Sequence, residues 1–401
     1  MKSHHMKTYY IRIFSLLMMV VFAQSCADDT KSTYLDYTDE EFELISQRLN
    51  LPSELFDYSP EFSEDFFNNH LDEGNIQSRR SSHKATLGRV LFYDTKLSVN
   101  EVVSCASCHQ QSLAFADDVA FSEGFDGELT TRNSLPLGNT IGFETSYRNN
   151  DAFGNFGFEN QAFFSWDEAN ENISLQSKAA ITSEIEMGLN MPQLIQRLSE
   201  EADYKVLFKK AYGDSHILEH RVLEAIEEFV NSIVSNNSRF DHESMNEGLN
   251  IFDNFSGYSA QENMGKKLYN NNCATCHSFD HQFTEVATAN NGLDINYEDK
   301  GVGEHTSDPS KNGVFKVPFL RNIELTGPYM HDGRFADLDQ VIDHYSEGIK
   351  NHENLHPNLK SGDQVRTMNF TVDEKAALKA YLLTLTDKEV IADAKFSDPF
   401  K

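Results

Sequence analysis

The sequence has 401 residues, with 63 Asp and Glu against 34 Lys and Arg, so its formal net charge is -29. A chain of this length has room for two domains of ordinary size, each with its own core. Such acidity excludes nucleic acid as a partner, because phosphates repel it, and would steer a basic redox protein toward the surface. Simple solubility of an exported protein would by itself account for most of the charge.

The N-terminus has the pattern of an export signal. Basic residues precede an apolar run from Ile13 to Ala23, which is too short to span a bilayer and fits a secretory signal. Cys26 follows small residues, as at a bacterial lipoprotein cleavage site, although Gln24 departs from that pattern. We expect residues 1–25 to be a signal peptide, with Cys26 acylated and the protein lipid-anchored in the periplasm or outer cell envelope. The alternative is an ordinary signal peptide with an incidental cysteine.

Residues 26–80 are acidic and aromatic and predict a tether plus a packing arm, with a short helix that opens at Asp39 and ends before Pro52. From Ser82 a helical pattern leads into the first cysteine motif.

Two motifs carry the chemistry. The pattern Cys-x-x-Cys-His occurs twice, as Cys105, Cys108 and His109 and as Cys273, Cys276 and His277. This spacing lets two thiols form thioethers with one haem while the histidine ligates its iron. Zinc binding or dithiol chemistry is the alternative, but a bare dithiol does not need the trailing histidine, and a zinc site would have to split its ligands between two pairs 168 residues apart. The sequence therefore predicts two covalently bound haem c groups.

Each motif follows a similar helical lead-in, which indicates a weak internal duplication. We expect a mainly α fold of two tandem cytochrome c-like haem domains with long loops. The predicted N-terminal domain covers 81–245 and the C-terminal domain 246–401, with a linker within 236–257. Long loops are expected at 121–165 and 290–312. Helices are expected with Pro192 as first residue, over the apolar stripe at 217–233, and at 372–385, where the last one closes the chain.

From about Ser82 to Leu385 the chain resembles the bacterial dihaem cytochrome c peroxidases. The stretches that carry the resemblance follow the same order through both predicted domains: 87–92, 104–109, 132–134, 166–167, 185–188, 316–322 and 325–335. The resemblance implies a peroxide-reacting haem on His109 and an electron-transfer haem on His277.

Three further residues match functional positions of that family. Trp166, the single tryptophan, occupies the place of a tryptophan between the haems, although a lone tryptophan is more often a core residue. Glu186 matches a distal acid that moves a proton between the two peroxide oxygens, with Gln176 as a nearby amide. The alternative for Glu186 is a solvated surface group.

The sequence departs from the peroxidase pattern at both irons. Where many members have a histidine that caps the resting peroxide-reacting iron, counting 16 residues past His109 reaches Phe125, which cannot ligate iron. We expect that iron to be open to peroxide without prior reductive activation. The alternative is a different loop register that supplies another ligand. Where many members have a methionine ligand for the second iron, this chain has Tyr345, the mark of the MauG branch. His344 and Met368 are the alternative ligands, and Tyr345 could instead be a core residue.

Asn133, Thr326 and Pro328 match the family's inter-domain calcium site, whose oxygen ligands suit that ion. A plain turn around Gly327 is the alternative. His331 and Arg334 lie in a family motif near the second haem, without an assigned role.

The leading hypothesis is an exported peroxidase that reduces hydrogen peroxide to water with electrons from a small donor protein such as a cytochrome c or a cupredoxin. The first alternative is a MauG-like, peroxide-driven oxidation of a protein or organic substrate through high-valent haem, which Tyr345 favours. The second is a non-enzymatic dihaem electron carrier. Relatives commonly dimerise, so a homodimer stays open.

Overall fold

The computed structural model describes residues 37–59, 82–140, 163–248, 250–279, 281 and 284–401. The predicted signal peptide, Cys26 and most of the predicted arm lie outside these residues. Within the described ranges, the model contains no helix with the length and apolar character needed to cross a membrane.

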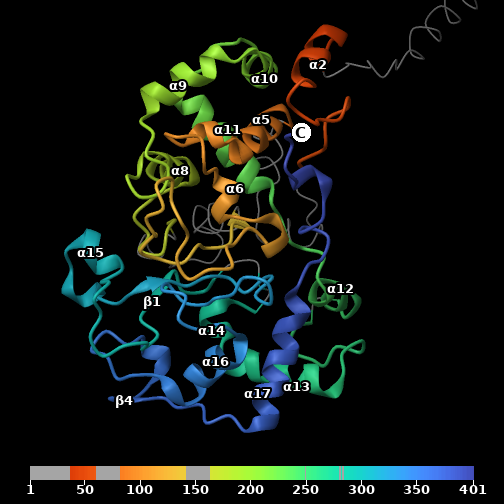
Figure 1. Cartoon of the computed structure of the whole chain (residues 1–401). Coiled ribbons are helices and arrows are strands. Elements are labelled where there is room, and N and C mark those ends of the chain that lie inside the picture. The colour runs from red at the N-terminus through yellow and green to blue at the C-terminus, as the bar shows by residue number, and fades with distance from the viewer. Residues whose placement is uncertain (1–36, 60–81, 141–162, 249, 280, 282–283) are drawn as a thin grey trace, which may run out of the picture.

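The described chain is mainly helical, which confirms the predicted fold class at that level (Figure 1). The α-helices are α2 (Asp39–Ile45), α5 (Ser82–Tyr93), α6 (Cys105–Cys108), α8 (Ile173–Thr182), α9 (Met191–Glu200), α10 (Ala202–Tyr212), α11 (Glu219–Ser232), α12 (Arg239–Asn246), α13 (Ala260–Asn272), α14 (Ala274–His277), α15 (Val302–Thr306), α16 (Leu338–Asp343) and α17 (Val372–Leu382).

Short elements complete the described part. The 3-10 helices are η1 (Thr95–Leu97), η2 (Gln111–Leu113), η4 (Pro309–Lys311), η6 (Pro357–Leu359), η7 (Leu383–Leu385) and η8 (Ala394–Phe396), and η5 (His344–Gly348) is a π-helix. Two antiparallel pairs of two-residue strands join β1 (Thr288–Ala289) to β2 (Phe315–Lys316) and β3 (Lys360–Ser361) to β4 (Gln364–Val365). Because both pairs are so short, helix packing holds the fold together.

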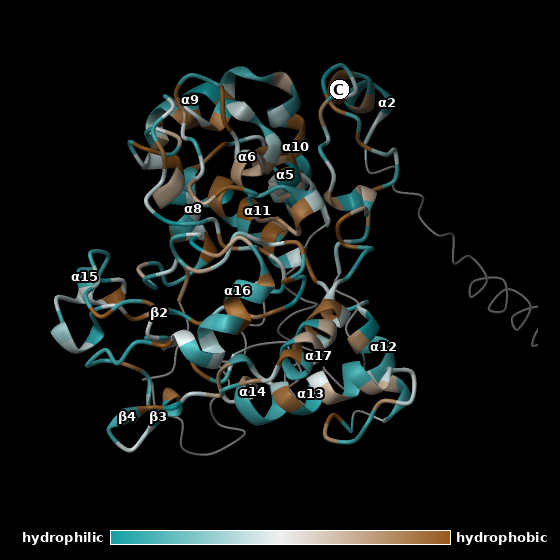
Figure 2. Ribbon diagram, turned by 60° about the horizontal axis from the view of Figure 1, so that its bottom comes forward, coloured by the Kyte–Doolittle hydropathy of each residue, from teal (hydrophilic) through white to brown (hydrophobic). Residues whose placement is uncertain are grey.

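Apolar side chains gather in two main clusters. The first draws on α2, α5 and α8–α11, and the second on α12, α13, α16 and α17. Figure 1 shows the first group of helices above the second, and Figure 2 shows α12 and α15 as largely hydrophilic outer elements. The end of the chain returns to the first cluster, where Val390 and Phe396 are buried. There the backbone of Leu49 pairs with Phe400 beside α2.

One helix crossing occurs twice. Gly88 of α5 lies so close to α11 that a Cβ atom there would come within 1.8 Å of the Ala225 carbonyl oxygen. Gly265 of α13 meets α17 in the same way, at 1.9 Å from the Ala377 oxygen. The side chain four residues after each glycine packs against the partner helix: Phe92 on Phe229 and Tyr269 on Tyr381. The two halves of the chain therefore share the same close helix–helix contact.

Replacing Gly265 by alanine should push α13 and α17 apart, because the new Cβ would overlap the Ala377 backbone oxygen. Overpacking of this kind typically costs about 1–3 kcal/mol of unfolding free energy. Urea unfolding followed by circular dichroism measures the loss. Gly138→Ala is the control, since a Cβ at Gly138 meets nothing within 4 Å. Equal urea midpoints for the two variants would contradict the expectation.

Two segments expected to be irregular contain helices. The predicted linker holds α12, which begins with a capping box between Ser238 and Asp241 and buries Phe240 in the second cluster. Asp241 also forms a bidentate, buried ion pair with Arg321, at 2.7 and 2.9 Å. The predicted loop at 290–312 holds α15 and η4. The polar composition of these segments did not indicate the three helices. For α12 the reason is that its stability depends on Arg321, which is distant in sequence.

Candidate active site

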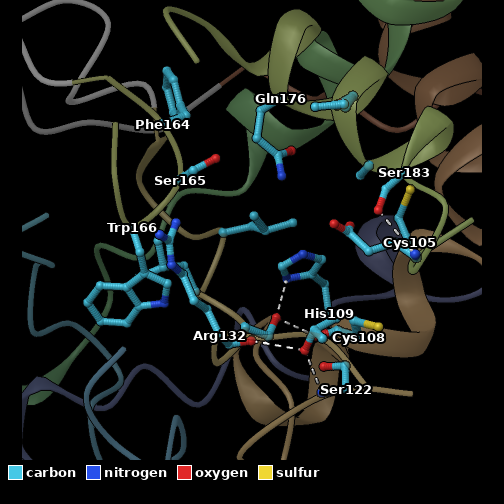
Figure 3. Close-up of a pocket in the computed structure, with 18 of the residues that line it drawn as sticks. Cys105, Cys108, His109, Ser122, Arg132, Phe164, Ser165, Trp166, Gln176 and Ser183 are labelled. Carbon is cyan, nitrogen blue, oxygen red and sulfur yellow. Dashed lines mark hydrogen bonds between the residues drawn. The ribbon is translucent and has the colours of Figure 1, made fainter. Parts of the chain in front are cut away.

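The first cavity lies beside α6 and has a volume of about 560 Å³. Cys105, Cys108 and His109 line it together with Gln176 of α8 and Glu186 from the turn after α8. Figure 3 shows the Gln176 amide directed toward the space above His109, with Trp166 on one side of that histidine and Cys105 on the other. The structure thus brings the predicted residues of the first site to one cavity.

The ring of His109 is fixed by its Nδ1 atom. Nδ1 lies 3.0 Å from the carbonyl oxygen of Phe115, and a carbonyl can only accept, so Nδ1 carries the proton and donates it. The Ser134 hydroxyl, 3.1 Å from Nδ1, donates to the Cys108 carbonyl at 2.7 Å. Burial lowers the pKa of His109, which keeps the ring neutral. Nε2 is therefore unprotonated and suited to an iron ion.

The cysteine thiols do not have the character of a redox dithiol. Burial raises the pKa of Cys105 to about 12, and that of Cys273 to about 12 as well. Catalytic dithiols show the opposite shift, because their thiolates are stabilised. Among the described residues, the structure holds no group of three or more His, Cys, Asp or Glu side chains arranged to bind a metal. The raised thiol pKa values weaken the dithiol alternative.

Glu186 occupies a partly buried position in the wall of the first cavity. Burial raises the pKa of its carboxyl group, and a hydrogen bond with the Ser183 hydroxyl opposes the rise. A carboxyl group whose pKa is moved toward neutrality can both accept and return a proton.

The loop that carries Phe125 is docked on the Glu186 segment. The amide of Phe125 donates to the Glu186 carbonyl at 2.9 Å, and its ring lies against Gly188. A Cβ on Gly124 would come within 1.7 Å of the Ile185 oxygen, so only glycine permits this approach. Phe125 itself does not line the cavity, and His109 is the one histidine that does so within the described ranges.

The second cavity has a volume of about 180 Å³ and is lined by Cys273, Cys276 and His277. His277 repeats the arrangement of His109: its Nδ1 atom donates to the Pro318 carbonyl at 2.8 Å, and burial lowers its pKa. Nε2 is again left unprotonated.

Tyr345 lines the second cavity from the π-helix η5. Single-turn π-helices are frequent at functional sites. Burial raises the pKa of Tyr345 to about 12, so its phenol is neutral unless a cation binds the oxygen. Of the alternative ligands, Met368 also lines this cavity. His344 does not line it, and its Nε2 atom donates to the Asn291 carbonyl at 3.0 Å.

Trp166 lies in the wall that the two cavities share. Its indole N–H donates to the Asn133 carbonyl at 2.8 Å, and its own carbonyl accepts from the Lys316 amide at 2.7 Å. Both cavities are lined by Asn133, Leu135, Pro136, Trp166, Lys316, Pro318 and Phe319. Trp166 therefore lies between the two cavities, and its place between two haems stays a prediction.

Charged groups brace the shared wall, and sequence reasoning missed them. Arg132 donates to Asp299 through two nitrogens, at 2.7 and 2.8 Å, and to Asp167 at 2.6 Å. Lys316 is buried, 3.4 Å from Glu168, and donates to a backbone carbonyl. Burial lowers the pKa of Lys316 to about 8 and raises that of Glu168. Arg132 and Lys316 both stand in stretches that carry the family resemblance, which is the signal that could have found them.

The residues of the predicted calcium site lie near one another, since Asn133, Thr326 and Pro328 all line the second cavity. The Asn133 amide donates to the Val119 carbonyl at 3.0 Å. His331 is buried with its ring stacked on Phe315, at 3.8 Å between centroids. Calcium binding at Asn133, Thr326 and Pro328 stays a prediction.

Arg334 lies in the same family motif as His331 but does not line either cavity. Its guanidinium group pairs with Asp294 and Asp332, each at 2.6 Å.

Comparisons with known proteins identify the family of this chain. The family model for di-haem cytochrome c peroxidase matches residues 82–248. The methylamine utilization protein MauG of Methylorubrum extorquens is 30% identical over 308 residues, covering 75% of this chain and 78% of that protein. The chain belongs to the dihaem cytochrome c peroxidase and MauG family. A cytochrome c551 peroxidase of Nitrosomonas europaea is 28% identical over 308 residues, covering 75% of this chain and 79% of that peroxidase.

Solved structures agree. A MauG-like protein associated with microbial copper homeostasis superimposes with a TM-score of 0.66 at 32% identity, covering 81% of this chain and 95% of that one. The diheme peroxidase BthA of Burkholderia thailandensis shares the fold, with a TM-score of 0.61 at 18% identity and coverage of 82% and 93%. As a member of this family, the chain is a haem-dependent oxidoreductase.

The residues present fit two covalently attached haems. At each cavity two partly buried cysteines lie beside a histidine whose Nδ1 atom donates to a backbone carbonyl, which leaves Nε2 for iron. The volume of the first cavity adds to this fit, whereas at the second the donor set alone carries it.

Proposed function

We propose that the protein reduces hydrogen peroxide to water with electrons from an external donor protein. The observation that carries the proposal is the composition of the first cavity: His109 provides a neutral imidazole nitrogen, and a partly buried carboxyl group, Glu186, lines the same space.

A haem held by Cys105, Cys108 and His109 would supply the centre at which the oxygen–oxygen bond of peroxide breaks. Glu186 would take the proton from one peroxide oxygen and deliver it to the other, so that the departing group leaves as water. Burial supports this role because it moves the pKa of Glu186 toward neutrality. Gln176 faces the same space and offers an amide for a hydrogen bond to peroxide.

Electrons are proposed to enter at the second cavity and to cross at Trp166. A small cytochrome c or a cupredoxin is the proposed donor. Two fixed contacts, through the indole N–H and the backbone carbonyl, hold the tryptophan in the wall between the cavities. Tyr345 is proposed to close the second iron, because its phenol oxygen is a hard ligand and lines the second cavity. Tyr269 and Tyr329 also line that cavity, but their hydroxyls donate to the Ser278 and Ile323 carbonyls.

The organisation of the chain follows from the same proposal. The repeated helix crossing at Gly88 and Gly265 supports two haem-binding halves. The proposed bounds of 81–245 and 246–401 are approximate divisions of the chain, because α12 packs in the second cluster, and Val390 and Phe396 pack in the first. Since c-type haem is attached outside the cytoplasm in bacteria, we also propose export by the signal at 1–25, and anchoring through Cys26 in the cell envelope. Calcium at Asn133 would brace the wall between the domains.

A resting-state electron paramagnetic resonance spectrum of the dihaem protein tests the proposal. One high-spin and one low-spin ferric signal are expected, because the first iron is open and the second has two axial ligands. Turnover of peroxide with a small reductant should accompany them. Two low-spin signals without turnover would instead indicate a dihaem electron carrier and would remove the proposal.

A MauG-like oxidation of a protein or organic substrate is the second candidate. Tyr345 favours it, because a tyrosinate ligand stabilises high oxidation states of iron better than methionine does. Similarity to MauG of Methylorubrum extorquens is a second support.

A further inference from the structure

Behind the second cavity a histidine is held between two tyrosines. His281 is fully buried, as are Tyr269 of α13 and Tyr381 of α17. The Nε2 atom of His281 lies 2.7 Å from the Tyr381 hydroxyl, and Nδ1 lies 3.3 Å from the Tyr269 hydroxyl. Neither His281 nor Tyr381 has a part in the proposed peroxide reaction.

Carbonyl acceptors fix the proton positions in this cluster. The Tyr269 hydroxyl donates to the Ser278 carbonyl at 2.7 Å, so its oxygen is left to accept from Nδ1 of His281. Nδ1 therefore carries the ring proton. Nε2 is then an acceptor, and the Tyr381 hydroxyl donates to it. The phenolic proton of Tyr381 thus already points at a neutral base.

The N-terminal half shows that this polar cluster is not required for packing. The two tyrosines correspond to Phe92 and Phe229 at the equivalent helix crossing, with ring centroids 5.3 Å apart there and 5.2 Å apart at the tyrosines. In the N-terminal half, the ring that packs on Phe92 from the loop after the first motif is that of Phe115, a phenylalanine and not a histidine. A purely structural role would not require three buried polar groups, which cost free energy to bury.

We propose that Tyr381 is a redox-active residue that gives one electron to the oxidised haem at the second cavity while its phenolic proton moves to Nε2 of His281. The O–H bond of Tyr381 breaks and an N–H bond forms, so Tyr381 becomes a neutral radical and His281 becomes an imidazolium ion. The electron reduces the haem centre by one unit. When an external donor returns an electron to Tyr381, the proton moves back. The inference rests on the proposed function, because hydrogen peroxide is the oxidant.

The surroundings suit a short-lived, strongly oxidising radical. Tyr269 lines the second cavity, so Tyr381 stands one ring behind the wall. Arg321 donates to the His281 carbonyl, and its charge is matched by the bidentate pair with Asp241. Burial and Arg321 lower the pKa of His281, so it is neutral at rest and returns the proton readily. A weak base also keeps the potential of the tyrosyl radical high, so that a weak oxidant could not form it.

The test uses the full-length protein with both haems attached. The protein is produced in cells supplied with ring-deuterated tyrosine. After mixing with hydrogen peroxide in the absence of a donor, samples are frozen rapidly and measured by electron paramagnetic resonance. A radical whose signal narrows with deuterated tyrosine is expected in the wild type. Tyr381→Phe should abolish it. His281→Gln should also abolish it, because the amide can accept the hydrogen bond but cannot hold the proton.

Tyr258→Phe is the matched control. Tyr258 is also buried and packs 6.4 Å from the Tyr381 ring, but its hydroxyl donates to Thr384 and has no imidazole partner. Its loss should leave the radical unchanged. The Tyr381→Phe variant places phenylalanine where the N-terminal half has Phe229, and unchanged haem absorption would verify that it folds.

A tyrosyl signal that persists in Tyr381→Phe would overturn the inference, as would a signal that narrows only with deuterated tryptophan. If peroxide changes the haem absorption but no tyrosyl radical appears, the inference alone fails. If peroxide leaves the haem absorption of the wild type unchanged, the proposed function and the inference both fail.

Discussion

Replacing Glu186 by glutamine should slow the reaction with hydrogen peroxide by about 10²–10⁴-fold, the usual contribution of a positioned acid and base. Glutamine keeps the size and polarity of the side chain, so the cavity is preserved, but an amide cannot take a proton from peroxide. Stopped-flow absorption of the haems after peroxide addition measures the rate directly.

The pH dependence gives a second readout of the same residue. The carboxylate form is the base, so the wild-type rate should rise with pH as Glu186 loses its proton. Because burial raises the pKa of Glu186, the midpoint of this rise should lie above the ordinary value of 4.5. Glu186→Gln should lose this midpoint. Glu184→Gln is the control, since Glu184 is exposed on the same turn. An unchanged rate in Glu186→Gln would remove the acid and base role.

Replacing Tyr345 by methionine should raise the reduction potential of the second haem, on the order of 0.1 V or more within the roughly 0.8 V that axial ligands span. A tyrosinate stabilises ferric and higher states, whereas methionine stabilises the ferrous state. Any long-lived, highly oxidised state formed with peroxide should therefore disappear in the variant. Redox titration and optical spectra after peroxide addition measure the two effects.

Met368→Leu separates the possible ligands, because Met368 lines the same cavity as Tyr345. If tyrosine is the ligand, Met368→Leu keeps the low-spin spectrum and the potential of the wild type. A loss of the low-spin signal in Met368→Leu, with no change in Tyr345→Met, would assign the ligand to Met368. Oxidation of a partner protein by the wild type but not by Tyr345→Met would favour the MauG-like function over simple peroxide removal.

Short-range patterns in the sequence were sufficient for much of the helical structure. Pro192 lies in the first turn of α9, and the predicted closing helix at 372–385 appears as α17 continued by a 3-10 turn. The apolar stripe at 217–233 is buried as α11, apart from the exposed Leu218 just before its first residue. These features depend on neighbours within a few residues, so the chain itself records them.

Contacts between distant segments could not be predicted in this way. His281 and Tyr381 are one hundred residues apart, and nothing in the spacing of either indicates a hydrogen bond. Arg132 likewise joins Asp299 across 167 residues. The gathering of the site residues at two cavities could be predicted only because the family resemblance indicated which distant residues belong together. The side chains outside that resemblance became visible only in the folded structure.

The return of the chain to the first cluster sets the order in which the protein can fold. N-terminal domains usually fold first, while the rest of the chain is still being synthesised. Here the core around α5 and α11 includes Val390 and Phe396, and Arg89 donates to the Ser397 carbonyl. That core is incomplete until the second half has been made, so the half that contains the first cavity completes its packing only when the end of the chain is available.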